Sequence, residues 1–134
     1  MKVVIAIDSF KGSLSSLEAG NAVAEGIKRA DNTIQTEVCA LADGGEGTME
    51  ALTTAMGGKI QTITATNPLG EKIQCQYGIA QKTAVIEMAA AAGITLISEE
   101  QKNPLYTTTY GVGEMIKDAI KKGCRRFIVG IGGS

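Results

Sequence analysis

The chain has 134 residues, of which 44% are hydrophobic and 20% charged, and its formal net charge is −1. This composition is sufficient for one ordinary domain with an apolar core. The small net charge excludes a basic surface for nucleic acid or anionic lipid, because many lysine and arginine contacts hold those partners. The absence of histidine excludes a Ser-His-Asp or Cys-His nucleophile and an HExxH zinc site within these residues.

The N-terminal residues indicate a cytoplasmic protein. The apolar run at residues 1–7 stops at Asp8, far short of a bilayer span, and no signal-peptide cleavage pattern follows it. The three cysteines, Cys39, Cys75 and Cys124, are widely spaced and lack a CxxC pattern. We therefore expect reduced thiols packed in strands and no membrane partner.

The first element in chain order is a strand over residues 2–7, a β-branched run typical of a strand buried on both faces. It ends at Asp8 and a polar loop follows. Ser15 and Glu18 then have the spacing of a capping box, which predicts the start of an amphipathic helix. Strand, loop and helix together make a first βα unit.

A second βα unit follows the same plan. We expect a strand over residues 36–42, a glycine-rich loop over residues 43–48, and a helix over residues 48–56. Two consecutive βα units imply a parallel sheet with right-handed crossovers, in which ligands bind outside the carboxyl ends of the strands. Asp8 and Asp43 are both predicted to lie there.

From residue 59 the hydrophobic period changes to alternation. Residues 59–66 and 71–79 predict an antiparallel hairpin around the turn at residues 67–70, and residues 83–88 predict a further strand. Residues 89–93 favour a short helix or a tight loop. This stretch is interpreted as an excursion from the α/β sheet.

The α/β pattern then returns, with a helix over residues 112–122 and a strand over residues 126–131. The chain stops in a glycine loop where another helix would follow, so we expect it to be cut short at its C-terminus. The predicted class is α/β, a Rossmann-like three-layer arrangement of a parallel sheet with flanking helices, interrupted by a β-rich excursion. The expected segments are an α/β part (1–58), an excursion belonging to a second domain (59–97) and a further α/β part (98–134).

The loop at residues 43–48 carries the strongest chemical signal. Its three glycines allow backbone amides to approach an anion at a helix N-terminus. Asp43 and Glu46 would repel a phosphate unless a divalent cation intervened, and Mg²⁺ bound by one or two carboxylates plus phosphate oxygens resolves that conflict. The alternative is that both carboxylates only cap the helix.

Two further sets of residues are weaker candidates. In the first loop, Lys11 could neutralise a transferring phosphoryl group and Asp8 could accept a hydroxyl proton, or both could be ordinary solvated loop residues. Glu87 lies in an apolar run and needs a partner there, unless it points outward from the strand. The P-loop and Rossmann fingerprints are both absent.

Five segments, in order, resemble the glycerate kinase family that is unrelated to P-loop kinases. They are DSFKGSLS (8–15), ADGGEGT (42–48), NPLG (67–70), YGVGE (110–114) and GIGGS (130–134). The resemblance spans the chain and corresponds to the N-terminal part of such an enzyme. It implies ATP-dependent, Mg²⁺-assisted phosphorylation of glycerate to a phosphoglycerate in a two-domain α/β protein, with the active site between the domains.

The resemblance also implies roles for individual residues. The catalytic candidates are Asp8, Lys11 and Asp43; the substrate- or nucleotide-binding candidates are Ser9, Gly44, Gly45, Glu46, Gly47, Thr48, Gly132, Gly133 and Ser134; the Mg²⁺ ligands are Asp43 and Glu46. Asp8 and Asp43 are alternative general bases, and the part of such an enzyme that lies beyond residue 134 is a third possible source of the base. A non-catalytic module that senses a phosphorylated metabolite and a kinase for another small sugar acid are the rival functions, and the sequence leaves the oligomeric state open.

Overall fold

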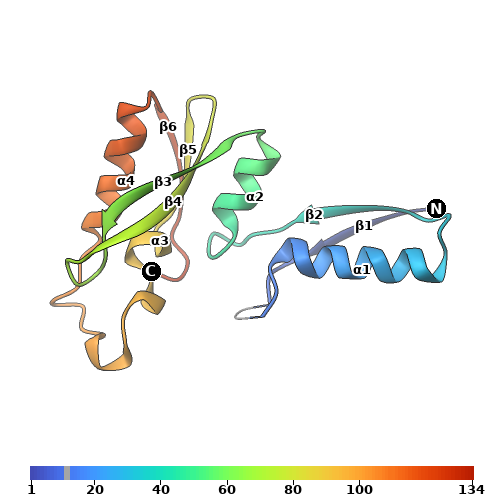
Figure 1. Ribbon diagram of the computed structural model, residues 1–134, viewed down its shortest axis with the longest axis horizontal. Coiled ribbons are helices and arrows are strands. Elements are labelled where there is room, and N and C mark those ends of the chain that lie inside the picture. Colours follow the sequence, from blue (N-terminus) through green and yellow to red (C-terminus); the bar gives the residue numbers. More distant parts are fainter. Residues whose placement is uncertain (11–12) are drawn as a thin grey trace. The chain divides into compact units, whose positions relative to one another are not determined.

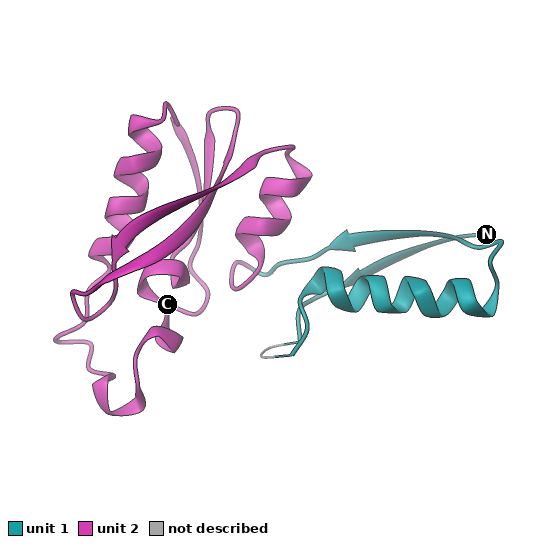
Figure 2. Ribbon diagram, in the orientation of Figure 1, with its two compact units in different colours: residues 1–43 teal, residues 44–134 magenta. Residues whose placement is uncertain are grey.

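The computed structural model describes residues 1–10 and 13–134, which fold into two compact units, residues 1–43 and 44–134 (Figures 1 and 2). Both units combine strands in sheets with flanking helices. The predicted α/β class is therefore confirmed. Within the described ranges, every helix is too short or too polar to cross a membrane.

The first unit contains the predicted βα unit and the strand that follows it. Strand β1 (Lys2–Ile7) leads into helix α1 (Ser16–Ala30), and strand β2 (Gln35–Ala40) returns parallel to β1. The capping box is present at the start of α1: the Ser15 hydroxyl accepts from the Glu18 N–H, and the Glu18 carboxylate accepts from the Ser15 N–H. Local sequence signals therefore placed the elements of this unit.

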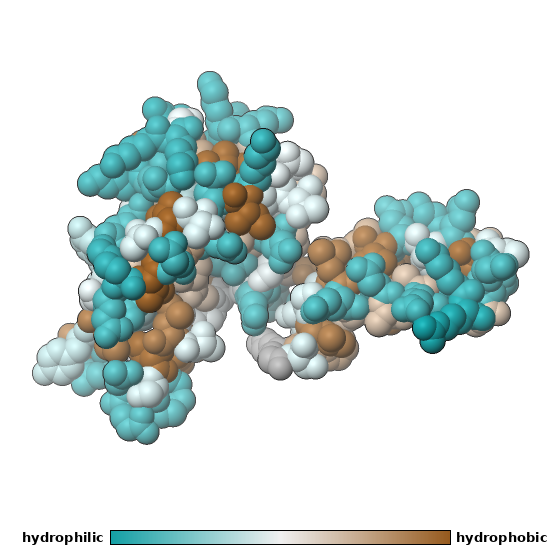
Figure 3. Space-filling view, viewed as in Figure 1, coloured by the Kyte–Doolittle hydropathy of each residue, from teal (hydrophilic) through white to brown (hydrophobic). Residues whose placement is uncertain are grey.

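Helix α1 packs on one face of this two-stranded sheet. Gly20 permits the close approach, because a Cβ atom there would lie 2.4 Å from Cγ1 of Val38. Ile5 is buried on this face, whereas Val4, its neighbour in β1, is 58% exposed. Apolar side chains therefore lie at the surface of this unit (Figure 3).

The second unit is built on a four-stranded sheet of order β3-β4-β5-β6. Its elements are α2 (Thr48–Ala55), β3 (Lys59–Thr66), β4 (Lys72–Ala80), β5 (Thr83–Glu87), α3 (Ala89–Ala92), the 3-10 turns Ile94–Leu96 and Glu99–Gln101, α4 (Tyr110–Lys121) and β6 (Arg126–Gly130). Strands β3 and β4 form the predicted antiparallel hairpin, β4 and β5 are also antiparallel, and β5 and β6 are parallel.

The second sheet contains strands from two of the expected segments. Strand β6 pairs with β5, from Thr83 opposite Arg126 to Glu87 opposite Gly130. Helix α2 packs on this same sheet, so the chain divides after residue 43. A short apolar strand does not specify its neighbour in the sheet, because its hydrophobic pattern is the same whichever strand it pairs with. That residues 59–97 belong to a second domain stays a prediction.

Helices cover both faces of the second sheet. Helices α3 and α4 enclose the main core, which includes Tyr77, Ile86 and Met115. On the other face, α2 lies against β4 so closely that a Cβ atom on Gly78 would come within 1.7 Å of Oγ1 of Thr53. Because side chains alternate along a strand, Glu87 lies on the α2 face while Ile86 enters the core.

Candidate functional site

In the first unit, two predicted site carboxylates follow neighbouring strand ends. Asp8 comes directly after β1 and Asp43 lies shortly after β2, and Ile7 pairs with Ala40 in the parallel ladder. Both aspartates therefore leave the sheet at the same carboxyl edge, as expected. The Ser9 N–H donates to Oδ1 of Asp8 at 2.7 Å, which orients this carboxylate at the start of the loop.

A serine hydroxyl joins the two strand ends at this edge. The Ser16 hydroxyl donates to the Ile7 carbonyl at 2.6 Å and accepts from the Leu41 N–H at 2.9 Å. It thereby links the first turn of α1 to the last residue of β1 and to the residue that follows β2. Asp8 and Asp43 come next along the chain, within two residues of these points. Ser16 is not among the residues predicted from the sequence, because a serine at the first position of a helix has no distinctive sequence signal.

The loop after β1 contains the predicted catalytic lysine. Phe10 pairs with Leu14 across the loop, and its N–H donates to the Leu14 carbonyl at 2.8 Å. Lys11 itself lies outside the described residues. Its catalytic role therefore stays a prediction.

Two glycine loops lie in backbone contact in the second unit. The first glycine loop comprises residues 43–48, of which residues 44–48 belong to this unit, and the second glycine loop comprises residues 130–134. The Gly132 N–H donates to the Gly44 carbonyl at 2.9 Å. A Cβ atom on Gly132 would lie 2.6 Å from Cα of Gly45, and one on Gly130 would lie 2.6 Å from the Gly44 carbonyl oxygen. The structure therefore brings together predicted site residues that are far apart in the sequence.

Several amides of the first glycine loop already have partners within the chain. The Gly44 N–H donates to Oγ1 of Thr48 at 3.1 Å, and the Thr48 N–H donates to the Gly45 carbonyl at 3.2 Å. Thr48 is only 6% exposed. These hydrogen bonds fix the loop internally, and the amide cradle for a ligand stays a prediction.

Glu87 binds the start of helix α2. Its Oε1 accepts from the Met49 N–H at 2.7 Å, and the carboxylate also accepts from the Gly47 N–H. Burial raises the pKa of Glu87, with smaller increases from Glu46 and Glu50, and these hydrogen bonds oppose the rise. The sequence signal was present, since a carboxylate in an apolar run needs a partner, but the sequence did not identify that partner.

The predicted Mg²⁺ ligands are two carboxylates, Asp43 and Glu46. Over residues 1–10 and 13–134 the structure contains no group of three or more His, Cys, Asp or Glu side chains able to hold a metal ion. Mg²⁺ at a phosphate-transfer site commonly takes only one or two carboxylates and completes its shell with phosphate oxygens and water. The two residues fit that donor set.

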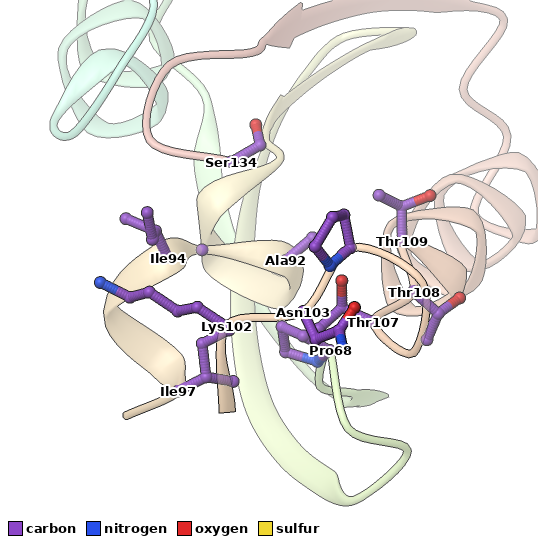
Figure 4. A pocket seen from close by; sticks show the side chains of 12 residues that line it. Pro68, Ala92, Ile94, Ile97, Lys102, Asn103, Thr107, Thr108, Thr109 and Ser134 are labelled. Atoms are coloured by element: carbon purple, nitrogen blue, oxygen red, sulfur yellow. The ribbon is translucent and has the colours of Figure 1, made fainter. Parts of the chain in front are cut away.

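A cavity of about 380 Å³ adjoins the second glycine loop at Ser134 (Figure 4), a size suited to a small ligand. Lys102 lies on one side of it, and Thr108 lies on the other (Figure 4). The Lys102 ammonium pairs with Glu99, and the Ser134 hydroxyl donates to the Ile131 carbonyl at 2.6 Å. The polar groups of this cavity are thus partly occupied by neighbouring residues.

The chain is similar to known proteins of one family. The model of the glycerate kinase family matches residues 3–134. The chain is 48% identical to a glycerate kinase of Haemophilus influenzae over 136 aligned positions, and 46% identical to a glycerate 2-kinase of Escherichia coli. Each alignment covers 100% of this chain and 36% of the relative, so the chain spans about a third of the length of these curated relatives.

A solved structure shows the same fold. The chain matches a crystal structure assigned to glycerate kinase 2 of Salmonella typhimurium LT2 with a TM-score of 0.85 and 43% sequence identity. The match covers 100% of this chain and 37% of that one. The fold of the described residues therefore occurs within a longer protein.

Proposed function

Because the chain belongs to the glycerate kinase family, we propose that the complete gene product transfers the γ-phosphoryl group of ATP to a hydroxyl of glycerate and forms a phosphoglycerate. The family match over residues 3–134 carries this proposal, because it includes every site residue predicted from the motifs. The contact between the two glycine loops supports it, because phosphoryl transfer depends mainly on positioning and on charge stabilisation.

Asp43 and Glu46 are the residues that would hold Mg²⁺ beside the phosphates. When bound, the ion offsets negative charge on the phosphate oxygens. Lys11 adds a positive charge for the transferring group. We place the anionic part of the ligand beside the first glycine loop, at the N-terminus of α2, where the helix contributes about half a positive charge.

Two aspartates are the candidates within this chain for the group that accepts the proton of the reacting glycerate hydroxyl. Asp8 and Asp43 both follow strand ends at one edge of the first sheet, and neither has histidine as a competitor in this chain. Asp8→Asn and Asp43→Asn separate the alternatives: loss of the base lowers kcat, whereas loss of a metal ligand alone is compensated by raised Mg²⁺.

The remaining predicted residues bind rather than react. Ser9, Thr48, Gly132 and Gly133 shape the loops, and Ser134 reaches the cavity of about 380 Å³. A cavity of that size has room for a three-carbon acid or part of a nucleotide. We assign it to ligand binding within the same site.

A coupled assay for ADP release tests the function. The complete gene product should release ADP when given ATP, Mg²⁺ and glycerate, and phosphorus NMR of the product identifies the phosphorylated hydroxyl. Binding of ligand without ADP release would instead indicate a metabolite-sensing module. ADP release with a different hydroxy acid, and none with glycerate, would reassign the acceptor.

A further inference from the structure

We propose that Glu87 is a positioning residue that holds the first glycine loop in the conformation that binds ligand. The inference rests on the proposed function, because it takes this loop to be part of the phosphoryl-transfer site. It assigns no chemical step to Glu87. Its carboxylate acts through the backbone of Gly47 and Met49.

Glu87 occupies a position in the fold from which it reaches the start of α2. It is the last residue of β5 and lies on the face of the sheet that α2 covers. Its Oε1 is 2.7 Å from the Met49 nitrogen, although the two residues are 38 positions apart in the sequence. A half-buried carboxylate bound to backbone amides is held far more firmly than a solvated one.

Helix α2 begins without a side-chain cap from its own N-cap residue. That residue is Gly47, with φ of 88°, and glycine has no side chain that could accept a hydrogen bond. A helix start leaves backbone N–H groups without intrahelical partners. Glu87, at the end of β5, accepts a hydrogen bond from one of these N–H groups, that of Met49. It therefore links the first turn of α2 to the sheet.

The first glycine loop is held at both of its ends. Glu87 pairs in register with Gly130 at the end of β6, and the Met88 N–H donates to the Gly130 carbonyl at 2.9 Å. Beyond Gly130, the Gly132 N–H donates to the Gly44 carbonyl. The start of the loop thus binds the second glycine loop, and its end binds Glu87.

This arrangement predicts a graded response to substitution. Glu87→Ala removes both acceptors, whereas Glu87→Gln keeps one carbonyl oxygen for the Met49 or Gly47 N–H. A loop displaced by about 1 Å lowers turnover by about 100-fold. In the complete gene product, kcat/KM for glycerate should therefore fall by about 100-fold in Glu87→Ala, and Glu87→Gln should recover part of the loss.

Asp118→Asn is the matched control. Asp118 is also a partly buried carboxylate of this unit, and it accepts from the Tyr77 hydroxyl at 2.6 Å and from the Lys122 ammonium at 2.8 Å. Its side-chain partners among residues 1–10 and 13–134 are Tyr77 and Lys122, which lie outside both glycine loops. Asp118→Asn should lower the unfolding temperature and leave kcat/KM at the wild-type value.

Hydrogen exchange tests the same inference without activity. Peptides covering residues 43–50 should exchange faster in Glu87→Ala than in the wild type by about tenfold, while peptides of β3 keep their rate. Unchanged exchange, or a loss of kcat/KM no larger than that of Asp118→Asn, would overturn the inference. If Glu87→Ala does not fold, kcat/KM and hydrogen exchange are measured on Glu87→Gln instead. An inactive wild type would refute the proposed function, and exchange would still decide whether Glu87 holds the loop.

Discussion

Gly132→Ala should disrupt the contact between the two glycine loops. The added Cβ atom would lie 2.6 Å from Cα of Gly45 and 2.9 Å from its nitrogen. Two non-bonded heavy atoms normally stay about 3.5 to 4.0 Å apart, so one loop must move by about 1 Å. Both partners are backbone atoms, and no flexible side chain is available to turn away.

The expected magnitudes follow from that displacement. Overpacking of this kind costs about 1 to 3 kcal/mol of the free energy of unfolding. The hydrogen bond from the Gly132 N–H to the Gly44 carbonyl is strained as well. Because the first glycine loop is proposed to bind the reacting phosphate, a shift of about 1 Å should also lower kcat/KM by about 100-fold.

Gly113→Ala provides a control with the same chemical change. Gly113 is exposed in α4, and a Cβ atom there meets nothing within 4 Å. Alanine favours a helix over glycine by about 0.8 to 1 kcal/mol, so this variant should be more stable than the wild type and keep its turnover. Urea unfolding and initial-rate kinetics of both variants measure these effects. A Gly132→Ala protein with wild-type stability and kcat/KM would refute the packing argument.

Three further substitutions test other parts of the molecule. Lys11→Ala should lower kcat by at least about 100-fold if the lysine balances phosphoryl charge; near-normal turnover in the ADP-release assay would reject that role. Thr53→Val should raise the free energy of unfolding by about 1 kcal/mol, because Oγ1 of Thr53 is buried without a hydrogen-bond partner among the described residues; a less stable variant would contradict this. Hydrogen bonds from Lys72 and Thr66 lower the pKa of Glu114 from its ordinary value of 4.5 to about 2. This carboxylate therefore contributes stability above pH 4.5 that is lost as the pH falls toward 2, and Glu114→Gln should flatten the acid limb of the stability–pH profile. An unchanged acid limb in that variant would speak against the assignment.

Local sequence signals were reliable where neighbouring residues determine the structure. Ser15 and Glu18 predicted the start of α1 because both members of the capping box lie within one helical turn. The turn at residues 67–70 was equally readable: Oδ1 of Asn67 accepts from the N–H groups of Leu69 and Glu71, and Gly70 has φ of 91°. These interactions span few residues, so the sequence contains all of their partners side by side.

The candidate site was predictable only in part. Asp8 and Asp43 lie at one edge of the sheet because two strands joined by a helical crossover run parallel, so that their carboxyl ends lie at the same edge. Ser16 was missed, since its partners are distant in the sequence: Ile7 ends β1 and Leu41 follows β2. The pairing of Glu87 with Met49 depends on which helix covers which face of the sheet, and hydrophobic periodicity does not contain that information.

By itself, the sequence determined the six strands and the longer helices to within a few residues, the parallel direction of the first two strands and the family resemblance through its five motifs. Only the tertiary structure decided that β6 lies beside β5, that Gly132 contacts Gly45, and that Glu87 caps α2. The physical reason is the range of the interactions. Propensities, caps and turns act over a few residues, whereas strand neighbours and close backbone contacts join segments that only the packed chain brings together.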